Sequence, residues 1–324
     1  MDNSEQTSSS PIALPWNLPW QAQAWKQFST NFLEQRLHHA WIIEGDKDFA
    51  INEFVVNLAK LVNCDEVNNG QPCGNCIQCQ QIETGNYADF ITVSVLDKKM
   101  QIGVDQIRAI NHTLVQKAYS GRYRVVTIQQ AELLNTASAN AFLKTLEEPG
   151  EKTLLLLQTL YPSRLLATIR SRCQQLSLTA SKPQVLQQWL QQQSPQTTQA
   201  EQLQALQASG YKPLLSELFL AENIVHKRLQ FFNDLDALLQ SKIKLSHFEK
   251  QHNIEYPLKL AWLEHYLFNH FSENLHDRLH LESFYSVLQE IRLQSLQARE
   301  VDKPLLLREI LIKWIALSTK LSHS

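Results

Sequence analysis

The chain has 324 residues, with 30 lysines and arginines against 32 aspartates and glutamates, so its formal net charge is -2. This balance argues against a protein held on nucleic acid by a strong basic field alone. Only 8 glycines occur, well under the usual share of about 7%, which argues against glycine-rich cofactor loops. The hydrophobic fraction of 44% is ample for a buried core, and the length predicts two or three domains.

The N-terminal segment lacks the features of an export signal. Its first ten residues, MDNSEQTSSS, have neither the basic start nor the apolar core of a secretory signal. No apolar run approaches the ~18 residues that a membrane span needs. A soluble, cytoplasmic protein with no membrane partner is therefore expected, and the polar residues 1–12 are predicted to form a disordered tail.

The front of the chain alternates helices with apolar strands. Helices are predicted over Gln21–Leu37 and over a stripe that begins at Ile51 and recurs at helical spacing to Val62. Further strands and helices follow in the same alternation. The predicted segments are the strands Trp41–Ile43, Phe90–Val95, Arg124–Ile128 and Thr153–Leu157, and the helices Gly103–Lys117, Ala139–Leu146 and Arg164–Ile169. This order indicates a parallel sheet covered on both faces.

The composition changes near residue 180. From Ser181 to Gly210 the chain is rich in glutamine, but interleaved leucines favour small helices over a disordered tract. From Ala221 to the end the pattern predicts longer amphipathic helices. The expected fold class is therefore an α/β front, a small helical middle and an all-α back.

Four of the five cysteines are Cys64, Cys73, Cys76 and Cys79, close together in a segment rich in turn residues. Zinc prefers four soft ligands in a tetrahedron, and a Cys-x-x-Cys turn can place two thiolates on one ion. The alternative is four unrelated buried thiols, but the polar surroundings are unlike a core. Because four thiolates leave no open position for water, a structural zinc ion is predicted.

The strand that ends at Gly45, followed by a helix, is the setting of a phosphate-binding loop. That loop needs a second glycine, a lysine and a hydroxyl, and here Ala50, Ile51 and Asn52 occupy these positions. Asp46 and Asp48 would repel a polyphosphate. A plain strand-turn-helix without a ligand is therefore the favoured interpretation, and no ATP is expected in this site.

The acidic residues that an NTPase needs are also missing, at the end of the strand Arg124–Ile128. A magnesium-dependent NTPase needs an acidic pair at the end of such a strand. Gln129 and Gln130 stand there instead, and Glu132 is displaced by two residues. The chain is therefore expected to have no ATPase activity of its own.

Two segments carry a family resemblance. Asn140–Pro149, which reads NAFLKTLEEP, and Leu165–Cys173, which contains Ser171-Arg172-Cys173, closely resemble segments of bacterial clamp-loader ATPases. With the cysteine module and the substituted ATP site, the chain resembles the family of delta-prime subunits of the bacterial DNA polymerase III clamp loader. The resemblance covers about residues 15–180; residues 221–324 match only in being helical, with a final helix from Pro304 to Trp314.

The resemblance implies a fold and partners. It implies an AAA+ domain over 13–179 with a zinc module at 64–79, a helical lid over 180–220 and a helical collar over 221–324. The implied partners are gamma or tau ATPase subunits and a delta subunit in a hetero-pentameric ring, with the sliding clamp and primer-template DNA reached through the complex. Nucleotidyltransferase activity would then belong to the polymerase holoenzyme rather than to this chain.

The resemblance also implies a role for Arg172, as an arginine finger that reaches a neighbour's ATP. A guanidinium supplied in trans neutralises charge on the transferring phosphate. Without the flanking motif, Arg172 would be interpreted as a surface arginine. His276 and His280, one helical turn apart, lack an acidic partner and are interpreted as a solvated helix face.

Two alternatives stay open at this point. An active motor ATPase of the same family is disfavoured by Ile51, Gln129 and Gln130. A zinc-ribbon protein that binds nucleic acid is disfavoured by the net charge of -2 and by the lack of a basic stripe; Arg122-Tyr123-Arg124 is interpreted as the polar entry to a buried strand.

Overall fold

A computed structural model gives the fold of the chain. It describes residues 18–252 except 98, 115, 117, 121 and 180–181, together with 258–259, 262–263, 266, 308–313 and 315. The chain divides into two compact units, Met1–Leu218 and Phe219–Ser324. The predicted tail 1–12 and the two histidines His276 and His280 lie outside the described residues. Of the predicted final helix, 304–307 and 314 also lie outside them, and 308–313 are helical.

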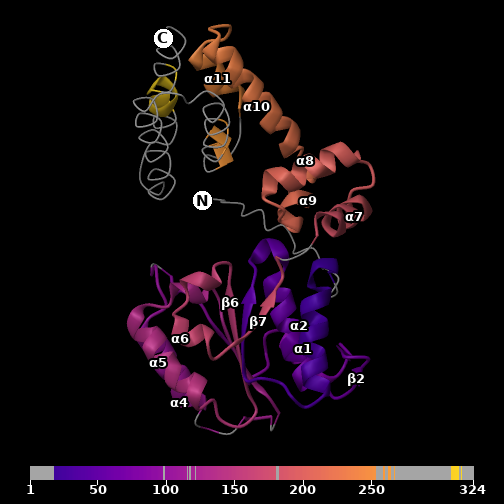
Figure 1. Cartoon of the computed structure of the whole chain (residues 1–324), viewed down its shortest axis with the longest axis vertical. Helices are drawn as coiled ribbons and strands as arrows, with labels where there is room; N and C mark the ends of the chain where they lie inside the picture. The colour runs from indigo at the N-terminus through magenta and orange to yellow at the C-terminus, as the bar shows by residue number, and fades with distance from the viewer. Residues whose placement is uncertain are drawn as a thin grey trace, which may run out of the picture. The chain divides into compact units, whose positions relative to one another are not determined.

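A five-stranded parallel sheet forms the centre of the first unit (Figure 1). Its strands lie in the order β4-β5-β6-β1-β7. Their bounds are β1 Ala40–Glu44, β4 Phe90–Val93, β5 Arg124–Ile128, β6 Thr153–Thr159 and β7 Gln174–Ser177. The central strand β6 is buried at all its positions, as expected for a parallel sheet that is covered on both faces.

Helices cover both faces of this sheet, on opposite sides in Figure 1. On one face α4 (Val104–Leu114), α5 (Thr136–Glu147) and α6 (Ala167–Arg170) contribute Ile107, Phe142 and Ile169 to a common core with the strands. On the other face lie α1 (Ala22–Leu33) and α2 (Ile51–Asn63), where Phe28 packs on Trp41 with ring centroids 5.3 Å apart. The predicted mixed α/β fold with a parallel sheet is confirmed.

Differences from the predicted elements occur at the ends of segments, at one edge of the sheet and in the cysteine insertion, where a hairpin over 67–72 and a helix over 77–83 were not predicted. The first helix ends at Leu33, before the predicted Leu37, because Gln35 takes a left-handed conformation with φ 57°. The strand β7 was not predicted, since Gln174 and Gln175 are exposed at the sheet edge and only Leu176 is buried. A polar edge strand lacks the apolar run by which buried strands are identified.

The glutamine-rich segment folds into helices, as predicted: α7 (Pro183–Gln193) and α8 (Gln199–Ser209). The helix α9 (Pro213–Ala221) follows it. Helix α8 begins with a capping box in which Thr198 and Glu201 satisfy each other's backbone amides. Within α7, Trp189 packs edge-on against Trp20 with ring centroids 4.9 Å apart. This contact joins the segment to the N-terminal turn of the α/β part.

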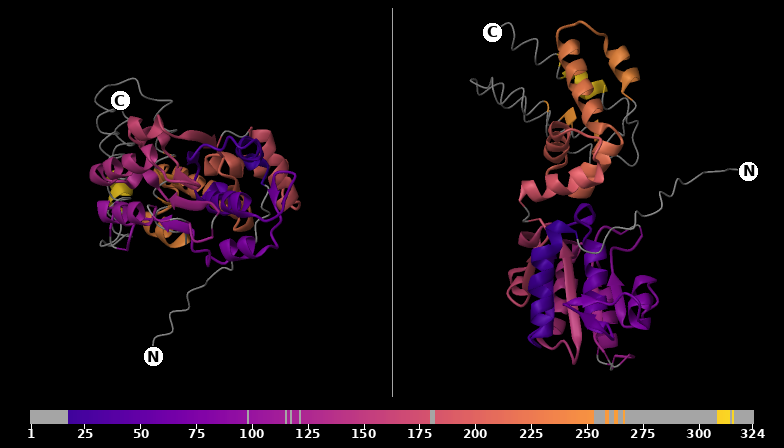
Figure 2. Two further views of the ribbon diagram at one scale, coloured as in Figure 1. Left: turned by 90° about the horizontal axis from the view of Figure 1, so that it is seen from below. Right: turned by 90° about the vertical axis from the view of Figure 1, so that its right-hand side faces the viewer.

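In the second unit, α10 (Ile224–Leu239) and α11 (Leu245–Gln251) lie side by side (Figure 2). The buried Phe231 packs against Phe248, with ring centroids 5.1 Å apart, and against Trp262 at 5.6 Å. Among the described residues, none of the helices combines the length and apolarity that crossing a bilayer requires.

Candidate metal centre, nucleotide-type pocket and Arg172

The four clustered cysteines belong to an insertion after α2. Cys64 is the C-cap of α2, and Cys76 is the N-cap of α3 (Ile77–Glu83), which carries Cys79. Between them the two-residue strands β2 and β3 form a hairpin over 67–72. Its turn is Asn69-Gly70, both at positive φ, which is the preferred chemistry for a two-residue hairpin loop. The hairpin turns the chain back, so that Cys73 meets Cys64.

The sulfur atoms of Cys64, Cys73, Cys76 and Cys79 all lie within 4.8 Å of one another. A tetrahedral zinc ion with Zn–S bonds of about 2.3 Å sets its ligands about 3.8 Å apart, so a small contraction of the cluster would close the shell. Two of the thiols, Cys64 and Cys79, are buried. The donor set therefore fits a structural zinc ion in number, type and spacing.

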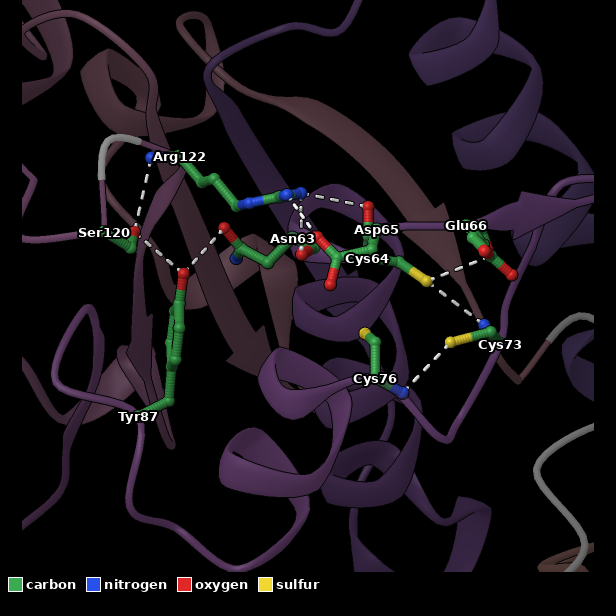
Figure 3. A network of polar contacts seen from close by, with 9 residues as sticks. All are labelled: Asn63, Cys64, Asp65, Glu66, Cys73, Cys76, Tyr87, Ser120 and Arg122. Carbon is green, nitrogen blue, oxygen red and sulfur yellow. Dashed lines mark hydrogen bonds and ion pairs between the residues drawn. The ribbon is translucent and has the colours of Figure 1, made fainter.

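Backbone amides prepare part of this cluster for thiolate charge. The amide of Cys73 donates to the sulfur of Cys64 at 3.1 Å, and the amide of Cys76 donates to that of Cys73 at 3.3 Å (Figure 3). Hydrogen bonds from the amides of Cys76 and Asn75 lower the pKa of Cys73 to about 7. Burial raises the pKa of Cys64 and of Cys79. A metal ion must therefore displace protons from the buried thiols, which makes its binding pH-dependent.

A cavity of about 410 Å³ lies at the carboxyl ends of β1, β5 and β6. It is lined by Gly45, Asp46, Lys47, Asp48, Ile51, Asn52, Gln129, Gln130, Glu132, Gln158, Thr159, Leu160, Tyr161 and Lys212. The structure thus brings the predicted loop remnant together with both glutamines that follow β5. The carboxyl edge of an open parallel sheet is the usual place for a ligand pocket, so the fold retains the place of a nucleotide site.

The backbone amides of the loop are engaged within the protein. Asp46 accepts a hydrogen bond from the amide of Asp48 through its side chain, at 3.0 Å, and one from the amide of Phe49 through its carbonyl, also at 3.0 Å. The amide of Ala50 donates to the carbonyl of Lys47 at 3.1 Å, which closes a 3-10 turn. A phosphate cradle needs such amides to point outward. These amides are therefore not available to a phosphate unless the turn opens.

Side chains of the pocket also pair with one another. The ammonium of Lys212 forms ion pairs with Asp46 and with Asp48, the latter at 3.1 Å. Burial opposes the charge of Lys212, but these two carboxylates outweigh it and raise its pKa. Where a hydroxyl would hold magnesium, Asn52 instead accepts a hydrogen bond from the amide group of Gln129 at 3.1 Å.

Lys212 is the charged partner of Asp46 and Asp48 that sequence reasoning missed; it also missed the pocket residues at the end of β6, 158–161. Lys212 stands just before α9, 166 residues after Asp46 in the chain, and its surroundings, Tyr211 and Pro213, mark only the start of a helix. Nothing in that local pattern indicates a pocket. Its position became visible only with the packing of the helical segment in the first unit.

Arg172 lies in the turn after α6, and its side chain is 38% exposed. Its guanidinium donates to the carbonyl of Thr168 at 3.0 Å and forms an ion pair with Glu147, the last residue of α5, at 2.9 Å. The neighbouring Cys173 lies outside the four-thiol cluster, and burial raises its pKa to about 12. Arg172 is thus held near the surface, away from the metal centre and the pocket lining.

Comparisons with known proteins place these features in a family. The family described as "DNA polymerase III, delta subunit" matches residues 20–182. The chain is 32% identical over 269 residues to the DNA polymerase III subunit delta' of Haemophilus influenzae, a match that covers 83% of this chain and 80% of the relative. It is 37% identical over 147 residues to the tau/gamma subunit of the same organism, covering 45% of this chain and 21% of that subunit.

Among solved structures, a DNA polymerase III gamma subunit-related protein from Thermotoga maritima superimposes with a TM-score of 0.46 at 16% identity, over 91% of this chain and 99% of that one. The sequence match to the Haemophilus subunit spans most of both proteins. It confirms the resemblance that rests on Asn140–Pro149 and Ser171–Cys173. The chain therefore belongs to the family of DNA polymerase III delta' subunits.

Proposed function

We propose that this chain is a non-hydrolysing subunit of the DNA polymerase III clamp loader, working in the cytoplasm. Its partners would be gamma or tau ATPase subunits and a delta subunit in a five-membered ring that loads the sliding clamp onto primer-template DNA. Family membership supports the place in the complex, and the matches to tau and gamma subunits support a shared AAA+ architecture.

One observation carries the non-hydrolysing assignment: Lys212 and the amides of the loop turn already have partners within the protein. Lys212 is shared between two aspartates, and the loop amides are engaged in a closed turn. A triphosphate would have to break these contacts and then lie beside Asp46 and Asp48, with Ile51 and not a lysine at the phosphate-binding position of the loop. Gln129 and Gln130 offer neither a magnesium ligand nor a base that could activate water.

We propose that Cys64, Cys73, Cys76 and Cys79 hold a structural zinc ion. Bound zinc supplies a cross-link between the end of α2, the hairpin turn and α3, and four thiolates leave it no position for a reacting water. The segment 64–79 is short and has few apolar residues of its own. We therefore expect the ion to stabilise this module and to take no part in chemistry.

The domain organisation follows the same proposal: an AAA+ domain over 13–179, a lid over 180–220 and an oligomerisation collar over 221–324. The division of the chain after Leu218 is compatible with a separate collar. It groups the helical segment 182–218 with the α/β part, as the ion pairs of Lys212 suggest.

Arg172 is the residue to which we assign a part in a neighbour's catalysis. Its partly exposed side chain, on a turn beside the end of α5, could leave Glu147 and extend toward a phosphate of the next subunit. A guanidinium offers a planar fork of donors to phosphate oxygens and keeps its charge at any pH that the protein meets. A protein without hydrolysis of its own would in this way be required for hydrolysis at one site of the ring.

The test reconstitutes the complex with gamma or tau and delta subunits and compares Arg172→Ala with the wild type. Trans-acting arginines contribute about 10³–10⁵ in rate at a single site. Because only one site depends on Arg172, total DNA-stimulated ATP hydrolysis should fall in part, while clamp loading falls further. Arg172→Lys should restore little, since an ammonium lacks the planar fork.

A matched control is Arg108→Ala, another arginine that pairs with a carboxylate on the surface of the first unit; it should leave hydrolysis and loading unchanged. Equal loading by Arg172→Ala and wild-type complexes would show that Arg172 is a surface residue only. An ATPase rate from the pure wild-type chain would overturn the non-hydrolysing assignment.

A further inference from the structure

Arg122 joins the strand β5 to the chain segment that carries the first cysteine. One guanidinium nitrogen of Arg122 donates to the carbonyl of Asn63 at 3.1 Å and to the carbonyl of Cys64, also at 3.1 Å. The other terminal nitrogen forms an ion pair with Asp65 (Figure 3). Three successive residues are therefore held by a side chain that is 58 positions away from Cys64 in the sequence.

These contacts lie where α2 ends. The last carbonyls of a helix have no partner within the helix, and they carry partial negative charge that favours a cation. Helix α2 ends at Asn63, and Cys64 turns away with extended dihedral angles. Arg122 satisfies carbonyls on both sides of that turn, so it holds the direction in which Cys64 leaves the helix.

The loop that carries Arg122 is itself anchored to the sheet. Asp89, just before β4 and 2% exposed, accepts hydrogen bonds from the amides of Tyr119 at 3.0 Å and Ser120 at 2.8 Å. The same carboxylate pairs with Arg124, the first residue of β5, at 3.1 Å. Ser120 in turn accepts a hydrogen bond from the amide of Arg122 at 3.3 Å. The guanidinium is therefore attached to the rigid core and not to a free surface loop.

A second, buried contact joins the same two segments. The hydroxyl of Tyr87 lies 3.1 Å from the side-chain oxygen of Asn63 and 2.8 Å from the hydroxyl of Ser120 (Figure 3). Asn63 is fully buried and also donates to the carbonyl of Ala59 at 3.1 Å. The end of α2 is thus tied to the loop before β5 both by Tyr87 and by Arg122.

We propose that Arg122 is a positioning residue for the metal centre: by holding the carbonyls of Asn63 and Cys64 and the carboxylate of Asp65, it pre-orients Cys64 as a ligand. This inference rests on the proposed zinc site. Cys73, Cys76 and Cys79 lie together in a seven-residue run, whereas Cys64 must be brought to them from the end of a helix. Cys64 is therefore the ligand whose placement depends most on a contact outside the module.

The test measures zinc affinity in the full chain. Reduced protein is stripped of metal and titrated with Zn²⁺ in competition with a chromophoric chelator, and Co²⁺ is used in parallel as a spectroscopic probe of tetrahedral thiolate coordination. Arg122→Ala should weaken Zn²⁺ binding about 10- to 100-fold, the usual effect of removing a group that orients a metal ligand. Arg122→Lys should recover only part of the loss, since one ammonium cannot span two carbonyls and a carboxylate.

The matched control is Arg172→Ala. The two arginine side chains are 37% and 38% exposed, and each pairs with a carboxylate, but Arg172 does not touch the module. This variant should bind Zn²⁺ as the wild type does. Asp65→Asn keeps both carbonyl contacts of Arg122 and removes only the ion pair, so its loss of affinity should be smaller than that of Arg122→Ala.

Thermal unfolding with and without metal separates positioning from general stabilisation. If Arg122 orients Cys64, the rise in Tm on adding Zn²⁺ shrinks in Arg122→Ala, because weaker binding gives less stabilisation at the same metal concentration. An equal fall in Tm with and without metal, at unchanged affinity, would overturn the proposal and leave the zinc site standing. A wild-type chain that takes up neither Zn²⁺ nor Co²⁺ would overturn both.

Discussion

The four-cysteine module and the pocket at the carboxyl edge of the sheet differ in the side-chain groups that each offers to a ligand. The module has a complete set of ligands, and the sulfur atoms lie within 4.8 Å of one another. The pocket has the place and the volume for a ligand, about 410 Å³, but Lys212 in it already pairs with Asp46 and Asp48, and Gln129 with Asn52. The comparison teaches that the arrangement of strands and helices creates the cavity, whereas a few side chains determine which ligand can bind.

The charges of the two regions make the same distinction. In the module, amides that donate to sulfur favour a thiolate at Cys73, so the site is prepared for a cation. In the pocket, Asp46 and Asp48 already have a cation, Lys212, which the chain supplies itself. The module therefore offers donors to a cation from outside, whereas Asp46 and Asp48 already have a cation within the chain.

The largest effect is expected from Cys76→Ser, which would remove one of the four ligands. We expect the variant to lose its zinc and to unfold locally over 64–79, while the sheet stays folded because the module is an insertion. Zinc content by elemental analysis and protease sensitivity of this segment are the measurements. Cys173→Ser is the control, since Cys173 lies outside the cluster, and it should retain full zinc content. If the wild-type protein contained no zinc, the proposed metal centre would be wrong.

A smaller but global effect is expected from Asp89→Ala, which would remove the carboxylate that holds the loop before β5. Asp89 is 2% exposed and pairs with the buried Arg124. Removing one partner of a buried pair lowers the free energy of unfolding by about 3–5 kcal/mol. Urea denaturation of wild type and Asp89→Ala is the measurement. Asp105→Ala, which breaks only the exposed pair with Arg108, should change the free energy of unfolding by less than about 0.5 kcal/mol.

The stability that Asp89 contributes through this pair should decrease at acidic pH. Burial raises the pKa of Asp89, but hydrogen bonds from Ser120, Tyr119 and Arg124 outweigh it, so the pKa lies below the ordinary value of 3.8. The contribution of Asp89 is then complete above pH 3.8 and is lost as the pH falls through the lower native pKa. The difference in stability between wild type and Asp89→Ala should therefore shrink only in that acidic window. A constant difference down to pH 2 would contradict this assignment.

Lys212→Ala tests whether the pocket balances its own charge. The lysine side chain is 27% exposed, so solvent screens its ion pairs and the loss of stability should be modest, about 1 kcal/mol, and smaller at high salt. Nucleotide binding should not appear, because only Lys47 of the pocket lining would then be left to offset the repulsion of phosphates by Asp46 and Asp48. Calorimetric titration with ATP is the measurement, and Lys182→Ala is the control. Tight ATP binding by Lys212→Ala would show that the lysine alone had excluded nucleotide.

The smallest effect, none at all on hydrolysis, is expected from Ile51→Lys. This variant restores the lysine of the phosphate loop but neither the magnesium ligand nor the water activator, since Gln129 and Gln130 are unchanged. Its ATPase rate should equal that of the wild type, measured on protein that circular dichroism shows to be folded, because Ile51 is buried. A measurable ATPase rate in this variant would show that the absence of a lysine at position 51 is by itself the reason why the wild type does not hydrolyse ATP.

Local spacing in the sequence was sufficient for much of this protein. The alternation of apolar strands and helices predicted the parallel sheet, the positions of Cys64 to Cys79 predicted the thiol cluster, and the substitutions at Ile51 and Gln129 predicted a pocket without a phosphate lysine or a metal ligand. These features depend on periodicity and on residues close together in the chain, which a sequence displays directly.

Only the tertiary structure decided the rest. The edge strand β7 is too polar to be recognised from its pattern. Lys212 reaches Asp46 across 166 positions, and Arg122 reaches Asp65 across 57. Each of these lysine and arginine contacts joins a helix start or a strand entry to a distant loop, and nothing in the local sequence around Lys212 or Arg122 indicates the partner. A long flexible side chain can serve many partners, so its partner is determined by how the elements pack and not by its neighbours in the chain.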